Sequence, residues 1–171
     1  RLMDPTTGNF CDVRQQGEIV VRFGQGFSGY FDNPQAEADS IRDGWFHTGD
    51  LAYFDERGQL YFVDRLKDIV RRGGENISAR EVEQVLLAYP PVKEAVVVAA
   101  PHPIYGEVVM AYLVPQDVGR TFSVEEIQKH CAGQLAAFKI PVHVRTTQSE
   151  ALPRTPTGKV QKFRLRPTEP I

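Results

Sequence analysis

The second half of the chain holds two stretches in which apolar residues recur at helical spacing. After Ser78-Ala-Arg-Glu81, four apolar residues follow at positions i, i+3, i+4 and i+7: Val82, Val85, Leu86 and Tyr89. A serine followed three residues later by a glutamate is a capping box, so this pattern predicts a short amphipathic helix that ends at Pro90-Pro91. Ser123-Val-Glu-Glu126 is a second capping box, and the apolar stripe of its helix is Ile127, Cys131 and Leu135.

Three runs rich in β-branched residues predict strands in the same half of the chain, at 93–100, 107–114 and 142–145. The resulting order is helix, strand, strand, helix, strand. This order lets two helices cover one face of a small sheet. We therefore expect an α+β fold in which helices pack on a mostly antiparallel three-stranded sheet.

The first 64 residues show a different pattern, with strands and turns in place of alternating helices. Residues 18–23 are β-branched and aromatic, and residues 51–54 and 59–63 flank a turn at 55–58 that ends in glycine. These features predict a strand followed by a hairpin. One short helix is expected at 33–41. Because the pattern changes after Asp64, we divide the chain into residues 1–64 and residues 65–171.

The composition excludes several classes of protein. The 171 residues are 42% hydrophobic and 25% charged, as in an ordinary globular domain. A net charge of −2 provides no basic surface for nucleic acid. The two cysteines lie far apart and the four histidines lack metal-ligand spacing, so neither a disulfide framework nor a side-chain metal site is expected.

The ends and the apolar runs of the chain bear on its location. No apolar run approaches the roughly 18 residues that span a bilayer, and the N-terminus lacks a signal pattern. Together with the unpaired cysteines, this predicts a soluble cytoplasmic protein with no transmembrane segment. The chain begins with Arg1 in place of methionine, so we expect a part of a longer polypeptide, with processing of the N-terminus or a choice of numbering as the alternatives.

The strongest candidate for chemistry is Lys159, in the run Pro153-Arg-Thr-Pro-Thr-Gly-Lys159. Proline and glycine restrict this loop, and no carboxylate lies within four residues of the lysine. A compact ammonium group on a flexible stem suits an anion that arrives and then departs, such as a reacting carboxylate or phosphate.

Two further segments carry polar residues in a suggestive pattern. His47-Thr-Gly-Asp50 places a carboxylate at the start of a strand, where it can accept hydrogen bonds from two vicinal hydroxyls; taken alone, it is also a simple turn before a strand. The basic stretch 65–72 precedes Gly73-Gly74, where a ligand could pass close to the backbone, although a solvated charged face is the alternative.

Gly24–Gly29 matches G-x-G-x-x-G without the strand–helix context of a dinucleotide site, so we interpret it as a surface loop.

Three of these motifs, around Asp50, along the basic stretch to Gly74 and around Lys159, occur in this order along the chain. Together they resemble the adenylate-forming superfamily, which includes acyl-CoA synthetases, luciferases of the firefly type and peptide-synthetase adenylation domains. The resemblance covers the whole chain, as the closing part of a longer enzyme. Four shorter matches are most similar to the branch that forms CoA thioesters of fatty and related carboxylic acids: Glu75-Asn76, the strand 95–98, Pro101-His-Pro and 138–141.

The resemblance implies a two-step reaction. A carboxylic acid reacts with ATP, accompanied by Mg²⁺, to give acyl-adenylate and pyrophosphate, and the thiol of coenzyme A then displaces AMP. It further implies that Asp50 and Arg65 bind the ribose of ATP or AMP, that Lys67 is the hinge between two domain orientations, and that Lys159 is the catalytic lysine of adenylation, which also contacts the nucleotide.

The same resemblance implies where coenzyme A binds. The strand from Arg71 to Asn76 would face the active site in the second orientation, and its CoA-binding residues would be Arg71, Gly73, Gly74 and Glu75, with the pantetheine passing the two glycines. Phe138 would be a surface on which the adenine stacks. Some members of the family carry basic residues shortly after this aromatic residue. Here the positions are apolar, which leaves three candidates for the CoA phosphates: Lys139, His143 and Arg145.

The resemblance also sets the expected domains and their limits. Residues 1–64 would be the end of the large N-terminal domain, residues 65–171 the mobile C-terminal domain, and the phosphate loop and acyl pocket would lie upstream, in cis. The isolated chain is therefore expected to be inactive. Two alternatives stay open: a non-catalytic module that binds CoA or a partner, and an adenylation domain that loads a carrier protein. Unpaired strand edges leave a homodimer open as well.

Overall fold

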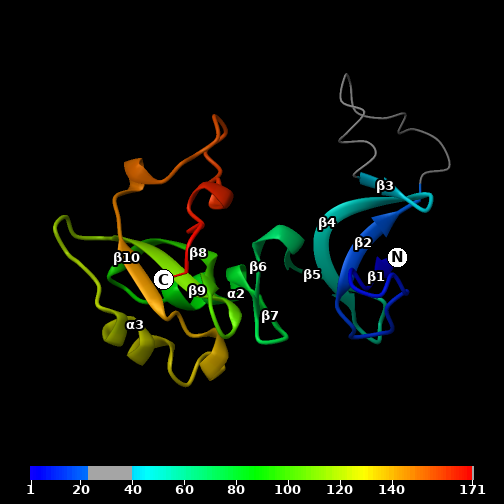
Figure 1. Cartoon of the computed structure of the whole chain (residues 1–171), viewed down its shortest axis with the longest axis horizontal. Coiled ribbons are helices and arrows are strands. Elements are labelled where there is room, and N and C mark those ends of the chain that lie inside the picture. The colour runs from blue at the N-terminus through cyan, green and yellow to red at the C-terminus, as the bar shows by residue number, and fades with distance from the viewer. Residues whose placement is uncertain (23–39, 171) are drawn as a thin grey trace. The chain divides into compact units, whose positions relative to one another are not determined.

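The computed structural model describes residues 1–22 and 40–170. The chain divides into two compact units, Arg1–Lys67 and Asp68–Ile171, each of which is described by itself (Figure 1). The division falls three residues after the boundary placed from the sequence. The glycine-rich loop Gly24–Gly29 and nearly all of the helix expected at 33–41 lie outside the described residues.

The first unit contains a five-stranded antiparallel sheet. Its strands are β1 (Leu2–Met3), β2 (Gly17–Val21), β3 (Ile41–Arg42), β4 (Trp45–Phe54) and β5 (Leu60–Arg65). The long strand β4 is central, since it pairs with β2, β3 and β5. Residues 51–54 and 59–63 thus form the expected hairpin, except that the second strand starts at Leu60.

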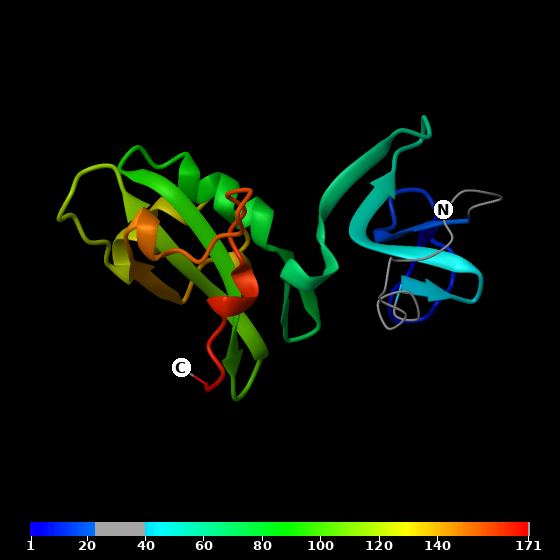
Figure 2. The ribbon, with the colours of Figure 1, turned by 90° about the horizontal axis from the view of Figure 1, so that it is seen from above.

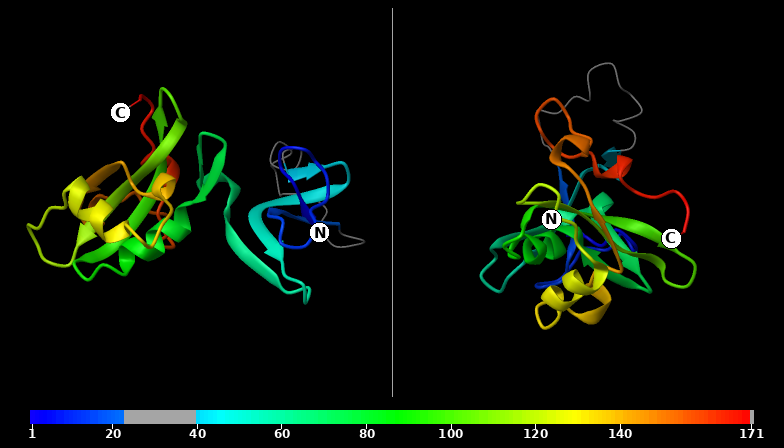
Figure 3. Two further views of the ribbon diagram at one scale, coloured as in Figure 1. Left: turned by 90° about the horizontal axis from the view of Figure 1, so that it is seen from below. Right: turned by 90° about the vertical axis from the view of Figure 1, so that its left-hand side faces the viewer.

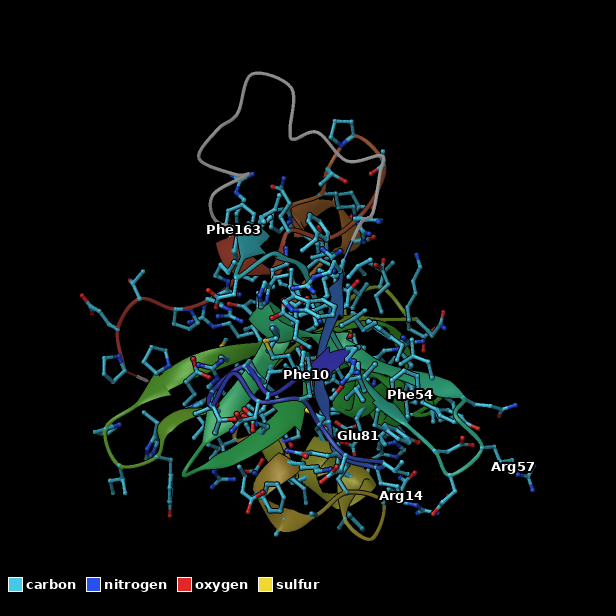
Figure 4. The ribbon with its side chains drawn as sticks, turned by 90° about the vertical axis from the view of Figure 1, so that its right-hand side faces the viewer. Phe10, Arg14, Phe54, Arg57, Glu81 and Phe163 are labelled. Carbon is cyan, nitrogen blue, oxygen red and sulfur yellow. The ribbon has the colours of Figure 1, made fainter. Side chains whose placement is uncertain are left out.

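The turn of this hairpin is stabilised by one carboxylate. Asp55 Oδ1 accepts hydrogen bonds from the backbone N–H groups of Arg57 and Gln59, at 2.9 and 2.8 Å. Gly58 has a φ of +74°, a conformation that glycine adopts without strain. Arg57 projects from the tip of the turn into solvent (Figure 4).

The second unit contains a five-stranded mixed sheet. Its strands are β6 (Ile69–Arg72), β7 (Glu75–Ser78), β8 (Val92–His102), β9 (Gly106–Pro115) and β10 (His143–Thr146). Strand β9 is central: it runs antiparallel to β8 and parallel to β10, and it meets β6 at Gly106. The three expected strands are β8, β9 and β10, and the hairpin β6–β7 extends their sheet.

Both predicted helices of this unit are present, α2 (Ala79–Leu87) and α3 (Val124–Cys131). Each begins where its capping box predicts, because Ser78 Oγ accepts from the Glu81 N–H and Ser123 Oγ from the Glu126 N–H. Over 1–22 and 40–170 there are also four short 3₁₀ helices: η1 (Leu66–Asp68), η2 (Ala137–Lys139), η3 (Ser149–Ala151) and η4 (Lys162–Arg164). The α+β fold class is confirmed.

The second helix is shorter than its apolar stripe. It ends at Cys131, so Leu135 lies beyond it, yet Leu135 remains buried in the same core. The thiol of Cys131 is fully buried, and this burial raises its pKa to about 11. Cys131 therefore acts as a small apolar residue of the core, as expected.

Strands β8 and β9 are apolar on both faces. Alternate residues such as Val97 and Val109 pack against the two helices, while their neighbours Val98 and Met110 pack on the opposite face. The opposite face is covered by the C-terminal segment, which contributes Leu152, Val160 and Leu165. Figure 3 (right) shows the strands between α3 and this orange and red segment, and Figure 2 shows the segment crossing them from above.

This second cover was not expected from the helix and strand pattern. Polar contacts help to hold it in place: Tyr112 Oη donates to the Leu165 carbonyl at 2.8 Å, and Lys162 forms an ion pair with Glu83 at 2.8 Å. Within the described residues, no helix is long and apolar enough to span a membrane.

Candidate functional site

The loop that carries Lys159 is a tight turn held by three hydrogen bonds from backbone N–H groups. The Thr155 N–H donates to the Lys159 carbonyl at 2.8 Å, and the Gly158 N–H donates to the Thr155 carbonyl at 2.9 Å. The Lys159 N–H donates to Thr155 Oγ1 at 3.2 Å. Gly158, with a φ of +85°, supplies the left-handed conformation that this turn requires.

The side chain of Lys159 has the opposite character, because it is exposed and unpaired. Across residues 1–22 and 40–170, no group forms a hydrogen bond or an ion pair with its Nζ. The structure thus holds the Lys159 backbone in place and leaves its charge available to an incoming anion.

Two ion pairs anchor the loop on either side, and neither was identified from the sequence. Before Lys159, Arg154 donates to the Glu94 carboxylate on β8, which also accepts from Ser149 Oγ. The Ser149 hydroxyl first, and the Arg154 guanidinium with it, hold the pKa of Glu94 below its ordinary value.

After Lys159, the anchor is Lys162. Its Nζ lies 2.8 Å from Glu83 Oε1, and the same oxygen accepts from the Val97 N–H at 2.8 Å. Both side chains are mostly buried, at 18% and 17% exposed. Glu83 on α2 therefore connects the C-terminal segment to strand β8.

The first unit contains the pair that the resemblance assigned to a ribose. Asp50 on β4 stands opposite Arg65 on β5, and Arg65 Nε donates to Asp50 Oδ1 at 3.1 Å. The Asp50 side chain is 30% exposed, so its second oxygen can still accept hydrogen bonds from a ligand. Asp50 is accordingly not sealed inside the sheet.

A buried glutamate orients the segment before Asp50. Glu18 on β2 is only 3% exposed. Its Oε1 accepts from the Gly49 N–H at 2.8 Å, and its Oε2 lies 2.7 Å from His47 Nδ1. Thr48 Oγ1 donates to the Ile19 carbonyl and accepts from the Asp50 N–H. The three contacts with Glu18 and Ile19 fix residues 47–49 against β2, and the Thr48 hydroxyl links the Asp50 N–H to them.

Lys67 lies where the two units divide. It belongs to η1, its side chain is exposed, and the first unit ends at this residue. A residue in a short 3₁₀ turn between compact units is in a suitable place to absorb backbone rotation.

The second unit contains a groove of about 410 Å³ beside the β6–β7 turn. Its lining comprises Arg72, Gly73, Glu75, Tyr105, Ala137 and Phe138. Three of the residues expected to bind CoA, namely Gly73, Glu75 and Phe138, are therefore brought together.

Arg72 and Tyr105 are lining residues that the sequence analysis did not single out. Arg72 Nη1 donates to the Phe138 carbonyl at 2.7 Å, and its guanidinium stacks over the Tyr105 ring at 4.7 Å. The Gly73 N–H donates to the Tyr105 carbonyl at 2.9 Å. In the sequence, Tyr105 is an aromatic residue next to a glycine between two predicted strands. An ordinary turn has the same pattern, so a single sequence does not identify Tyr105 as a lining residue.

Arg71 and Gly74 do not line this groove. Successive strand residues point to opposite faces, so Arg71 projects away from Arg72, and the Arg71 N–H donates to Glu107 Oε2 at 2.7 Å. Gly73 and Gly74 have φ values of +56° and +92°, as the two central residues of a type I′ turn require. Gly74 therefore shapes the turn.

The cations near the groove are distributed differently from the expectation. Lys139 Nζ is held by both oxygens of Glu81, at 2.7 Å each, so its charge is already compensated. His143 and Arg145 lie on β10. Arg72 is the cation that lines the groove. Among the described residues, no group of three or more His, Cys, Asp or Glu side chains could hold a metal ion.

Comparison with known proteins accords with this geometry. Residues 81–159 match the family model of the AMP-binding enzyme C-terminal domain. Oxalate–CoA ligase from Arabidopsis thaliana is 40% identical over 155 residues, which are 91% of this chain and 30% of that protein.

Two solved structures are similar over nearly the whole chain. One is o-succinylbenzoate CoA synthetase from Bacillus subtilis in complex with its acyl-adenylate intermediate, with a TM-score of 0.83 and 35% sequence identity. The match covers 99% of this chain and 34% of the synthetase chain. The other is ATP-bound MatB from Rhodopseudomonas palustris, with a TM-score of 0.82 and 39% sequence identity. That match covers 97% of this chain and 33% of the MatB chain. The chain spans about a third of the length of these relatives.

The buried Glu18 yields a testable prediction. Glu18→Ala leaves the Gly49 N–H and the His47 ring without their partner, which should lower the free energy of unfolding of the first unit by about 2 kcal/mol. Trp45, the single tryptophan, lies in this unit, so its fluorescence during urea titration measures the change.

A matched control is available in the same unit. Glu56 pairs with Arg14, but both side chains are largely exposed, so Glu56→Ala should leave the unfolding midpoint unchanged. Equal destabilisation by the two substitutions would contradict the role given to Glu18.

Proposed function

Because residues 81–159 match the family model of the AMP-binding enzyme C-terminal domain, we propose that the chain is the C-terminal part of an ATP-dependent acyl-CoA ligase. In the parent protein a carboxylate attacks the α-phosphate of ATP to give acyl-adenylate and pyrophosphate. The thiol of coenzyme A then attacks the acyl carbon and displaces AMP. Residues 1–64 would close the N-terminal domain, and residues 65–171 would form the mobile C-terminal domain.

The exposed, unpaired ammonium group of Lys159 on a fixed backbone is the observation that carries this proposal. Negative charge gathers between the substrate carboxylate and the α-phosphate as adenylation proceeds. A preorganised cation at that point stabilises the transition state by about 3–4 kcal/mol. Lys159 would act in this way, with no general acid or base required of it.

The pair Asp50 and Arg65 would hold the nucleotide by its ribose. Arg65 occupies one oxygen of Asp50, which orients the carboxylate, and the other oxygen can accept from ribose hydroxyls. Lys67, at the end of the first unit, would be the hinge at which the C-terminal domain changes orientation between the two half-reactions.

The groove beside the β6–β7 turn would bind coenzyme A. The rings of Tyr105 and Phe138 offer apolar faces for an adenine, and Arg72 offers a charge for a phosphate. Gly73 and Gly74 keep side chains away from the path of the pantetheine arm, next to Arg71 and Glu75. The groove lining supports this role for Gly73 and Glu75, and the turn geometry supports it for Gly74. Arg71 lies on the opposite face of β6, so its part in CoA binding rests on the family resemblance alone.

Mg²⁺ would accompany ATP and neutralise phosphate charge. Among the residues that the structure describes, no group of three or more His, Cys, Asp or Glu side chains could hold the ion. Its coordination would fall to the nucleotide and to the remainder of the parent protein.

The adenylation role of Lys159 is tested in the full-length parent. Lys159→Ala should lower the rate of acyl-adenylate formation by about two to three decades, because one preorganised cation is lost. ATP–pyrophosphate exchange measures this step, and thioester formation from preformed acyl-adenylate should be affected much less. Lys129→Ala, which removes another exposed lysine of the same domain, is the control and should be without effect.

The chain by itself should not adenylate any acid, since it spans about a third of the relatives it matches. Purified chain, incubated with ATP, Mg²⁺ and a panel of carboxylic acids, is expected to release no pyrophosphate above background. Steady release of pyrophosphate in proportion to the concentration of the chain would contradict this expectation.

The groove is tested by the second half-reaction. Tyr105→Ala removes one aromatic wall and should raise the KM for coenzyme A about tenfold, while adenylation keeps its rate. Ile104→Ala truncates the neighbouring residue, which is more exposed than Tyr105, and should change neither constant. If both variants raise the KM equally, the groove is not the site.

A further inference from the structure

A continuous series of hydrogen bonds joins the sheet of the second unit to the peptide bond before Lys159. It starts at Glu94 on β8, whose two carboxylate oxygens accept from Ser149 Oγ and from Arg154 Nη2. It ends at the other terminal nitrogen of Arg154, Nη1, which donates to the Gly158 carbonyl at 3.1 Å.

We propose that Glu94 and Arg154 are positioning residues for Lys159: they hold the Gly158–Lys159 peptide so that the ammonium group is presented at a constant place. This proposal rests on the function proposed above for Lys159. Neither residue is required to touch a substrate.

The geometry requires arginine in this position. The guanidinium is planar and rigid, so it can bind a carboxylate through one nitrogen and a carbonyl through the other at the same time. A lysine would carry the same charge but has a single nitrogen, and could not bridge Glu94 and Gly158 with the same fixed direction.

Glu94 has a second effect, which is electrostatic. Arg154 is a permanent cation four residues from the Gly158 carbonyl and close in space to the loop of Lys159. Without Glu94, that charge would oppose a second cation nearby and would leave Arg154 free to move into solvent. The carboxylate both compensates the charge and fixes the guanidinium.

The backbone contacts of the loop show why this anchor matters. The turn closes on itself through Thr155, which binds the N–H and the carbonyl of Lys159. These contacts lie inside the loop and cannot set its position on the domain. On the side before Lys159, the series through Arg154 is the polar connection that reaches the loop tip from the sheet.

The first test uses this chain and amide hydrogen exchange. The reporters are the N–H groups of Thr155 and Gly158, which are bonded inside the loop, and the reference is a set of strand amides in β8 and β9. In Glu94→Gln and in Arg154→Lys, the loop amides should exchange about tenfold faster relative to the strand amides, as the loss of a charge-assisted hydrogen bond implies.

A matched control separates positioning from general stability. Arg120 and Glu126 form an ion pair in the same unit, with side chains 35% and 29% exposed against 32% and 27% for Arg154 and Glu94. Glu126→Gln should therefore weaken the unit to a similar extent, but loop and strand amides should respond together. An equal response of loop and strand amides in Glu94→Gln and Arg154→Lys would overturn the proposal.

The second test uses the full-length parent. Glu94→Gln and Arg154→Lys should lower kcat for ATP–pyrophosphate exchange about tenfold with little change in the KM for ATP, and thioester formation from preformed acyl-adenylate should keep its rate. A rise in KM with unchanged kcat would contradict positioning. If the parent forms no adenylate at all, the proposed function fails, whereas the exchange experiment on this chain still decides whether Glu94 and Arg154 hold the loop.

Discussion

The second unit depends on the burial of both faces of strands β8 and β9. Val97 and Val109 are fully buried on one face, and Val98 and Met110 on the other, so neither face can be left to water. Each fully buried side chain of this size is worth about 1.5–3 kcal/mol. Two helices cover one face, and the other requires a cover of its own. The C-terminal segment supplies it, and Lys159 lies within that segment.

This arrangement separates two tasks that one short segment performs. Apolar residues before and after Lys159, Leu152 and Leu165, hold the segment on the sheet without direction. Ion pairs with defined geometry then set its orientation, through Arg154 on one side and Lys162 on the other. The result is a loop that is part of the packing of the domain while its lysine stays in solvent.

Local contacts were readable from the sequence, and long-range contacts were not. The two capping boxes join residues three apart, and the β4–β5 hairpin turns within five residues, so spacing alone predicts them. The pairs that orient the candidate site are separated by far more: 29 residues for Glu18 and His47, and 60 for Glu94 and Arg154. A single sequence carries no periodic signal at such distances, because the partners depend on which strands become neighbours.

The lysine and its motif could be identified because the chain around Lys159 combines turn residues with an unpaired charge. Its supports could not be identified, because Glu94 reads as an ordinary polar residue at the start of a strand. The same holds for Glu18, whose burial follows from the pairing of β2 with β4.

The groove illustrates how strand alternation decides which charge can serve a ligand. Arg71 and Arg72 are adjacent in sequence and equal in charge, yet only Arg72 points into the groove, where the Phe138 carbonyl and the Tyr105 ring fix its guanidinium. A shift of one residue in the register of β6 would exchange the two. The two-glycine turn sets that register, since Arg72 and Glu75 must flank it as a pair. The glycines that let a ligand approach therefore also determine which arginine meets it.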